Sequence, residues 1–341
     1  MNENKYLRWL AGTDSAWWND SADIAEVENA MQNGAVGVTT NPILISQVLN
    51  GNRALLNGYK DEISAISDSN RKAEKIIEII TKDIAGRFLS IYEQTEGENG
   101  YVCAQVNPKY PGDADYMFEN ALRLASWAPN ISVKIPVTAA GLEVVEECVA
   151  RGINVTATVS FTVPQVLAVE EAYQKGLKRA EAGGSPRLCN AVIMVGRLDD
   201  YLRDAAHDGR KIIDESSIVK AGTAAMKRAY NFFVKKGTMV KLMPAGMRGV
   251  YHTAELAGAD IRYSIHPKIQ GAIMREEPET LERMDEPVPQ NAIDELMTIR
   301  EFVRAYEPDG MKTEEFIAYG VTQKTLAQFV DAWNIIESFS F

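Results

Sequence analysis

The chain has 341 residues, and its 36 basic and 47 acidic residues give a formal net charge of −11. This acidic balance argues against nucleic acid and anionic membranes as partners, so an anionic ligand must be met by local arginines. Three widely spaced cysteines and three histidines without metal-ligand spacing predict no disulfide framework, no metal and no cofactor. Because the sequence has neither a signal-type apolar segment near Met1 nor a run of about 18 apolar residues, we expect a cytoplasmic protein.

Short apolar runs rich in β-branched residues alternate with amphipathic stretches along the chain. In chain order, the predicted strands are 16–20, 35–39, 101–106, 131–135, 154–158, 191–195, 238–243 and 260–265. The predicted helices between them are 24–33, 113–128, 139–151, 162–175 and 221–236. Such alternation is typical of parallel sheets, and eight strands predict an α/β fold, a (β/α)8 barrel of the TIM type.

Two segments exceed a minimal barrel. One is a helical insertion after the second strand, residues 50–96, with helices at 55–67 and 70–96. The other is a C-terminal helical extension, residues 276–341, with helices at 289–306 and 313–338. The apolar side chains of this extension are predicted to pack against the barrel or a second subunit, and they are Phe316, Tyr319, Leu326, Phe329 and Trp333.

The sequence contains no linker that would divide it. Residues 183–186 predict only a turn, and residues 285–288 predict only a loop. We therefore expect residues 1–341 to form a single domain. The long helical additions favour a homo-oligomer.

A lysine interrupts the fourth predicted strand. Residues 131–136, with the sequence ISVKIP, place Lys134 among aliphatic side chains. Lysine is rarely buried without a partner, so Lys134 either extends to the mouth of the barrel with its charge in water or carries a neutral amine. A neutral amine is a nucleophile toward carbonyl carbon. The strand alone leaves both a structural and a catalytic interpretation open.

Other polar side chains gather at the carboxyl ends of the predicted strands, where barrels of this kind carry their active sites. Together they would supply one carboxylate, amides, hydroxyls and two guanidinium groups beside the lysine. Each alone could be an ordinary turn residue or, for the arginines, half of a surface ion pair, so their joint placement is what favours a site. In chain order they are Asp20, Thr39, Asn41, Gln105, Thr156, Thr158, Arg197 and Arg248.

This set of groups supports imine formation followed by cleavage or formation of a carbon–carbon bond. Lys134 would attack a ketose carbonyl, and the protonated imine would accept the electrons of the breaking bond. Asp20 could take the proton from the hydroxyl whose carbon becomes the aldehyde, and Asn41 could hold a substrate hydroxyl without titrating. Arg197 and Arg248 could each grip phosphate in a fork geometry, so a sugar phosphate fits best.

Several segments resemble the transaldolase family. They are residues 37–42 (GVTTNP), 133–138 (VKIPVT), 141–142 (GL), 152–158 (GINVTAT), 195–197 (VGR) and 257–260 (AGAD), and residues 19–24 (NDSADI) resemble the family's first strand end. The resemblance covers about residues 16 to 270 in the family's order. It implies a class I aldolase barrel in which Lys134 forms the Schiff base.

The resemblance also implies roles for the strand-end residues. Arg197 and Arg248 would bind phosphate, and Asp20, Asn41 and Thr158 would be catalytic or contact the substrate. Combining this with the strand ends, we predict the catalytic residues to be Lys134, Asp20, Gln105 and Thr158. The predicted substrate-binding residues are Thr39, Asn41, Thr156, Arg197 and Arg248.

The chain departs from the family pattern at the positions that manage water. Gln105 stands where transaldolases have a glutamate on the third strand that acts through a water on imine formation and hydrolysis; the related fructose-6-phosphate aldolases have glutamine. Met194 stands where those aldolases have tyrosine and transaldolases have phenylalanine. Neither an amide nor a thioether titrates near neutral pH. Thr156, Val192 and Gly246 replace an asparagine and two serines, which thins the phosphate site.

These features predict a transaldolase, a transferase of the pentose phosphate pathway that moves a dihydroxyacetone unit between small-molecule sugar phosphates. Chain length, the insertion and the paired arginines favour this prediction. Two alternatives stay open. An aldehyde-lyase of the fructose-6-phosphate aldolase type is favoured by Gln105, and a barrel that binds a sugar phosphate without turnover would fit the loss of both water-activating groups.

Overall fold

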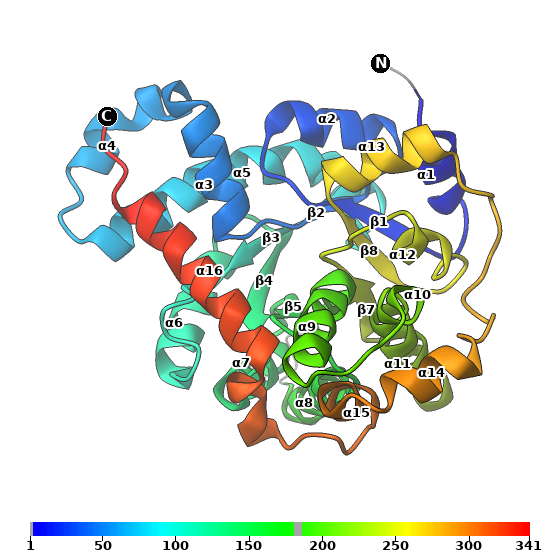
Figure 1. Cartoon of the computed structure of the whole chain (residues 1–341). Helices are drawn as coiled ribbons and strands as arrows, with labels where there is room; N and C mark the ends of the chain where they lie inside the picture. Colours follow the sequence, from blue (N-terminus) through cyan, green and yellow to red (C-terminus); the bar gives the residue numbers. More distant parts are fainter. Residues whose placement is uncertain (1–2, 181–185) are drawn as a thin grey trace.

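The computed structural model describes residues 3–180 and 186–341. In this part of the chain, eight parallel strands form a nearly closed barrel with helices around it (Figure 1), which confirms the predicted (β/α)8 fold. The strand order is β7-β6-β5-β4-β3-β2-β1-β8, and β7 lies next to β8 without a described ladder between them. The strands are β1 Ala16–Asn19, β2 Gly37–Val38, β3 Tyr101–Gln105, β4 Ile131–Pro136, β5 Val155–Thr158, β6 Cys189–Ile193, β7 Lys241–Pro244 and β8 Arg262–Ile265.

The strands are buried on both faces, as expected for a parallel sheet covered by helices. All residues of β3, β4, β5 and β6 are buried. The helices that follow the strands cover the outside of the barrel (Figure 1). They are α2 Ile24–Gln32, α6 Ala114–Ala125, α7 Ala139–Ala150, α8 Val163–Arg179, α9 Val195–Asp208, α10 Glu215–Ile218, α11 Ala221–Lys236, α12 Tyr251–Ala254 and α13 Pro267–Glu276, with α1 Lys5–Leu10 preceding β1.

Polar side chains at the strand ends begin the following helices. Asn41 accepts a hydrogen bond from the Leu44 amide at 3.1 Å and starts α3 Pro42–Gly51, with Pro42 in the first turn. Thr138 accepts from the Gly141 amide at 2.9 Å and starts α7. These caps satisfy amides that have no partner in the first helical turn. The chain therefore turns sharply at the mouth of the barrel, where its polar residues collect.

The insertion after β2 and the C-terminal extension are both helical, as predicted. After α3, residues 50–96 contain the 3-10 segment η1 Arg53–Tyr59, α4 Lys60–Ser64 and α5 Ser69–Gln94. The extension consists of α14 Gln290–Leu296, α15 Arg300–Tyr306, the 3-10 segment η2 Thr313–Ala318 and α16 Gly320–Glu337. Helix α16 packs on α3, α5 and α9 and runs past the barrel mouth (Figure 1), so the predicted apolar stripe is buried against the same chain. None of the described helices is long and apolar enough to cross a bilayer.

Some predicted boundaries are wrong. The strand predicted at 191–195 ends at Ile193, because the amides of Arg197 and Leu198 already donate to the Met194 carbonyl and begin α9. Val195 is fully buried, so its side chain has the same apolar signal as a strand residue. Helices α1, α3, α9, α10, α12 and α13 are not among those predicted, and the helix expected at 289–306 is interrupted between α14 and α15.

Two predicted connections have different outcomes. Residues 285–288 have no helix or strand, which confirms the predicted loop. The turn predicted at 183–186 lies, except for Pro186, outside the described residues.

Candidate active site

A cavity of about 370 Å³ opens at the carboxyl ends of the barrel strands. The structure brings seven of the predicted site residues to this cavity, and the predicted residues Gln105 and Thr156 are not among the described residues that line it. The seven are Asp20, Thr39, Asn41, Lys134, Thr158, Arg197 and Arg248.

Lys134 reaches the cavity from the barrel interior. Its side chain extends from β4 and is 7 % exposed, and its Nζ atom donates to the Thr40 carbonyl at 3.2 Å. No carboxylate of the described residues forms an ion pair with it. The amine is therefore held by packing and one carbonyl, within reach of a molecule bound in the cavity. This placement fits the catalytic interpretation better than a lysine that extends into water.

Asp20 follows β1 and is oriented by a hydroxyl from the next strand. The Thr39 hydroxyl donates to Asp20 Oδ1 at 2.8 Å and lies 2.7 Å from the Ser264 hydroxyl on β8. Because the single hydroxyl proton of Thr39 points to the carboxylate, Ser264 is the donor to Thr39. The chain of hydrogen bonds fixes one oxygen of the Asp20 carboxylate, and the Asp20 side chain lines the cavity.

Asn41 and Thr158 contribute polar groups that do not titrate. The side-chain oxygen of Asn41 caps α3, so its amide nitrogen is left to donate toward the cavity. Thr158 ends β5, and the next residue, Val159, has φ +53°, a left-handed conformation that is strained for a β-branched residue. The buried amide of Gln165 donates to the carbonyls of Val137 and Val159 at 3.3 and 3.4 Å. This amide holds the turn that presents Thr158.

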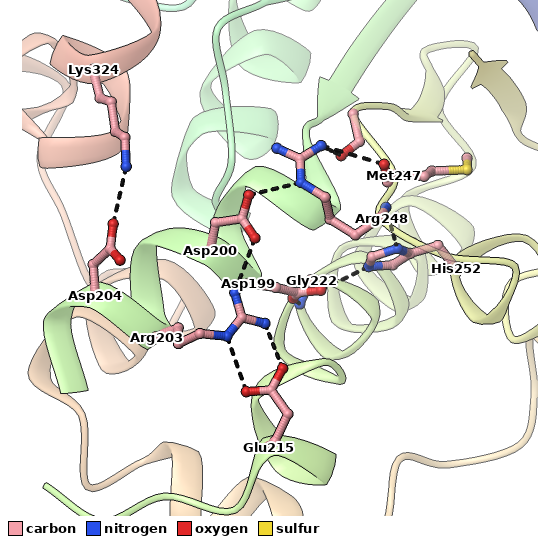
Figure 2. A network of polar contacts seen from close by, with 11 residues as sticks. Asp199, Asp200, Arg203, Asp204, Glu215, Gly222, Met247, Arg248, His252 and Lys324 are labelled. Atoms are coloured by element: carbon pink, nitrogen blue, oxygen red, sulfur yellow. Dashed lines mark hydrogen bonds and ion pairs between the residues drawn. The ribbon is translucent and has the colours of Figure 1, made fainter. Parts of the chain in front are cut away.

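The two arginines come from neighbouring strand ends and are held by different partners. Arg197, in the first turn of α9, donates to Gln328 at 2.6 Å and Thr325 at 3.3 Å, both on α16. Arg248 lies in the loop after β7 and donates through Nε to Asp200 at 2.7 Å (Figure 2). Both guanidinium-bearing side chains line the cavity.

The pKa of Arg197 is shifted by its surroundings. Burial and the neighbouring Arg248 guanidinium lower the pKa of Arg197, and the carboxylates of Asp20 and Asp200 oppose the shift. Two cations that share a partly buried site are stabilised by an anion placed between them. The arrangement is suited to a phosphate group.

Gln105 and Thr156 are paired in register with Lys134 on either side of β4. Gln105 is 5 % exposed, and its side-chain oxygen is buried without a hydrogen-bond partner among the described residues. Thr156 is fully buried, where its hydroxyl contacts Ser132 at 2.8 Å and accepts from Asn190 at 3.2 Å. Thr156 therefore belongs to a polar layer inside the barrel, away from the cavity.

The cavity also contains residues that the sequence analysis did not select. Ser264, His266 and Lys268 come from the end of β8 and the start of α13. They lie at the carboxyl end of the eighth strand, so the position of barrel active sites at strand ends also predicts them. Phe329 on α16 also lines the cavity, and no local signal separates it from the rest of its apolar stripe.

The cavity at the mouth of this (β/α)8 barrel thus combines an amine from an inner strand with a carboxylate and two guanidinium groups. The family model described as Transaldolase/Fructose-6-phosphate aldolase matches residues 17–339. The chain belongs to this family, which confirms the resemblance of its motifs.

Curated relatives agree with this assignment. A protein named transaldolase from Thiobacillus denitrificans is 31% identical over 214 residues, which are 60% of this chain and 58% of the relative. A transaldolase of Mycolicibacterium smegmatis is 29% identical over 250 residues, 67% of this chain and 65% of the relative. A transaldolase of Neisseria meningitidis is 30% identical over 195 residues, 54% of each chain. The matches span less than two thirds of the length of these relatives.

Proposed function

We propose that the protein is a transaldolase, as its relatives are named, and transfers a dihydroxyacetone unit between sugar phosphates through a Schiff base on Lys134. One observation carries the proposal: the amine of Lys134, the carboxylate of Asp20 and the side chains of Arg197 and Arg248 line the same cavity. A phosphate held by the arginines would place the remainder of a sugar in the space between them and the lysine.

The first half of the reaction releases an aldose phosphate. The neutral amine of Lys134 adds to the ketose carbonyl carbon, and loss of water gives a protonated imine. Asp20 takes the proton of the hydroxyl on the carbon that becomes the aldehyde, and the electrons of the bond between that carbon and its neighbour nearer the imine move into the imine. The aldehyde product leaves, and an enamine of dihydroxyacetone stays covalently attached to the lysine.

The second half runs these steps in reverse with an acceptor. The enamine carbon attacks the aldehyde of a second aldose phosphate, and the protonated Asp20 returns its proton to the new hydroxyl. Water then adds to the imine and releases the product ketose with the free lysine. Asn41 and Thr158 supply the neutral donors that hold the substrate hydroxyls in both directions.

Gln105 supports a second candidate, an aldehyde-lyase. Its side-chain oxygen is buried next to Lys134 and has no hydrogen-bond partner in the described part of the chain, so it can accept a hydrogen bond from a water or from the hydroxyl formed on the way to the imine. It cannot take up a proton as a glutamate would. If the enamine is protonated by solvent and hydrolysed instead of meeting an acceptor, free dihydroxyacetone is released.

The two reactions are separated by product analysis with fructose 6-phosphate. For the transferase, product forms only when an aldose phosphate acceptor is added, and dihydroxyacetone stays below detection. Release of dihydroxyacetone at the same rate without an acceptor would assign the lyase. Binding of fructose 6-phosphate without either product would leave only a sugar-phosphate-binding barrel.

We further propose that the chain acts as a single domain and as a homo-oligomer in the cytoplasm. Residues of the insertion and of the C-terminal helices join the barrel strands in one continuous apolar core, which supports the single domain. Light scattering coupled to size-exclusion chromatography measures the oligomeric state, and a monomeric mass at micromolar concentration would contradict the second proposal.

A further inference from the structure

A carboxylate and an imidazole are buried together beneath the arginine end of the cavity. Asp199 on α9 and His252 on α12 have fully buried side chains, and His252 Nε2 lies 2.9 Å from Asp199 Oδ2. The other oxygen of Asp199 accepts from the Gly222 amide at 2.8 Å. Neither side chain lines the cavity, so the steps proposed above do not use them.

The opposite nitrogen of the imidazole contacts the backbone of Arg248. His252 Nδ1 accepts a hydrogen bond from the Arg248 amide at 3.3 Å, and Figure 2 shows the ring between this amide and Asp199. A nitrogen that accepts carries no proton, so Nε2, 2.9 Å from Asp199 Oδ2, is the nitrogen of the ring that bears one. Asp199 thus orients the ring, and the ring holds the backbone of Arg248.

The loop that carries Arg248 packs directly on α9. A Cβ atom on Gly196 would lie 2.5 Å from the Gly246 carbonyl and 2.6 Å from Arg248 Cγ, so only glycine allows this approach. Gly246 has φ +61°, the left-handed region that favours glycine. The loop therefore has little freedom, and its position depends on a few contacts.

The side chain of Arg248 has a separate and weaker support. Asp200 accepts from Arg248 and from Arg203, and Arg203 in turn pairs with Glu215 (Figure 2). The side chains of Asp200, Arg203 and Glu215 are 38%, 42% and 61% exposed. Ion pairs this exposed are screened by water and salt and contribute little. The Arg248 side chain also donates through Nη1 to the Gly246 and Met247 carbonyls of its own loop, at 2.8 and 3.3 Å, so its direction follows the loop backbone that His252 contacts.

We propose that His252, oriented by Asp199, is a positioning residue for anion binding in the cavity. It fixes the Arg248 amide and thereby aims the guanidinium at the phosphate of the substrate. The inference rests on the proposed function for its substrate class. It differs from that function in its prediction, because it concerns the affinity for an anion rather than the chemistry at Lys134.

Two variants of His252 test the two ring nitrogens separately. His252→Asn keeps an acceptor near the position of Nδ1 and loses the group that faces Asp199. His252→Gln keeps a donor near the position of Nε2 and loses the acceptor for the Arg248 amide. A purely structural role predicts that the glutamine variant is the better tolerated, since it keeps the buried carboxylate paired. Positioning of Arg248 predicts the opposite.

The readout is the dissociation constant of inorganic phosphate, measured by calorimetry, together with KM and kcat for fructose 6-phosphate. We expect His252→Gln to weaken phosphate binding and to raise KM, each about tenfold, because one hydrogen bond to the backbone of Arg248 is lost. The value of kcat should stay within about threefold of the wild-type value. His252→Asn recovers most of the affinity. His207→Phe, at an exposed site on α9, is the control for loss of a histidine.

A double-mutant cycle shows whether the effect passes through Arg248. In an Arg248→Ala background, His252→Gln should leave phosphate affinity unchanged within about twofold. Equal losses in both backgrounds, or weaker phosphate binding by His252→Asn than by His252→Gln, would overturn the proposal.

Two further outcomes are also decisive. If either variant fails to fold, His252→Phe combined with Asp199→Leu removes the acceptor without leaving a buried charge, and unchanged phosphate affinity in that folded protein would refute the positioning role. If the wild-type protein binds phosphate but turns over no ketose phosphate, the proposed function fails while phosphate affinity still decides the role of His252.

Discussion

Lys134 lies in a strand whose residues are all buried, yet its amine has one hydrogen-bond partner among residues 3–180 and 186–341, the Thr40 carbonyl. A polar group in such surroundings costs stability unless it is compensated. The cavity beside it explains why the position is tolerated, because water or a ligand can complete its hydrogen bonds. At the scale of single residues, the site contains buried polar groups whose hydrogen bonds within the protein are incomplete.

Replacing Lys134 by methionine tests this interpretation. Lys134→Met removes the nucleophile and keeps most of the side-chain volume. Turnover should fall to the uncatalysed background, while the affinity for fructose 6-phosphate stays within about tenfold, because the arginines still hold the phosphate. Steady-state kinetics and calorimetry measure the two quantities. Residual turnover near the wild-type rate would refute the role of Lys134.

Arg248 should distinguish phosphorylated from unphosphorylated substrates. Arg248→Ala removes a charge-assisted contact, so KM for fructose 6-phosphate should rise about ten- to a hundredfold, and that for fructose should hardly change. Arg179→Ala, which breaks surface ion pairs on α8, is the matched control. An equal rise for both sugars would argue against phosphate recognition at this position.

Most of the site could be predicted because its residues share one position, the carboxyl ends of parallel strands, where barrels of this kind carry their active sites. Asp20, Lys134 and Arg248 were found in this way, and the structure brings all three to one cavity. Phe329 could not be found, since it reaches the cavity from a helix far along the chain. The distance of Thr156 from the mouth of the barrel could not be predicted either. The alternation of side chains along a strand tells which way a side chain points and not how far it lies from the mouth.

At the scale of elements, the junction between β4 and α7 is unusually tight. A Cβ atom on Gly141, in the first turn of α7, would lie 1.8 Å from the Pro136 carbonyl. Pro136 ends the strand that carries Lys134. The close contact transmits any displacement of the helix to the end of the strand.

Gly141→Ala should therefore damage both stability and activity. The methyl group must push the helix from the strand, so we expect a loss of about 1–3 kcal/mol in the free energy of unfolding, with reduced kcat. Gly86→Ala is the control, since a Cβ there meets nothing within 4 Å and should stabilise α5 by about 0.5–1 kcal/mol. Urea unfolding measures both, and a Gly141→Ala protein as stable as wild type would contradict the account.

Elements with a strong hydrophobic period were predictable, and those defined by tertiary contacts were not. Helix α11 has the predicted bounds, Ala221–Lys236, because its apolar face repeats over four turns and Gly237 ends it in a left-handed conformation. Helix α9 was missed because its buried first residue, Val195, continues the apolar run of β6. Propensity alone does not mark the point where a strand ends and a helix begins.

At the scale of the whole molecule, burial makes stability sensitive to alkaline pH. Burial raises the pKa values of Cys148 and Cys189 to about 12, from an ordinary thiol value of 9.0. It also raises the pKa of Tyr201 to about 12. Because these groups ionise more readily in the unfolded chain, their stabilising effect is complete below pH 9 and is lost as pH rises toward 12.

We expect the free energy of unfolding to be flat near pH 8 and to fall above pH 9. Each buried thiol should contribute about 1.4 kcal/mol per pH unit between its unfolded and folded pKa values. Urea titrations at several pH values measure the slope. Cys148→Ala and Cys189→Ala should each reduce it, and an unchanged slope in both variants would show that other groups cause the loss.

Although the molecule carries a net negative charge, the side chains of Arg197 and Arg248 lie together at the cavity. Its net charge of −11 would repel a sugar phosphate, and Arg197 and Arg248 reverse that field at the cavity. The proposed chemistry requires that a ketose phosphate drawn to this site reacts with Lys134 and with no other amine.

Reduction with borohydride tests that requirement most directly. In the presence of fructose 6-phosphate, reduction of the imine should leave a stable adduct on the peptide that contains Lys134, and mass spectrometry should find none in Lys134→Met. An adduct on another lysine, or no adduct while the sugar phosphate is bound, would contradict the central claim.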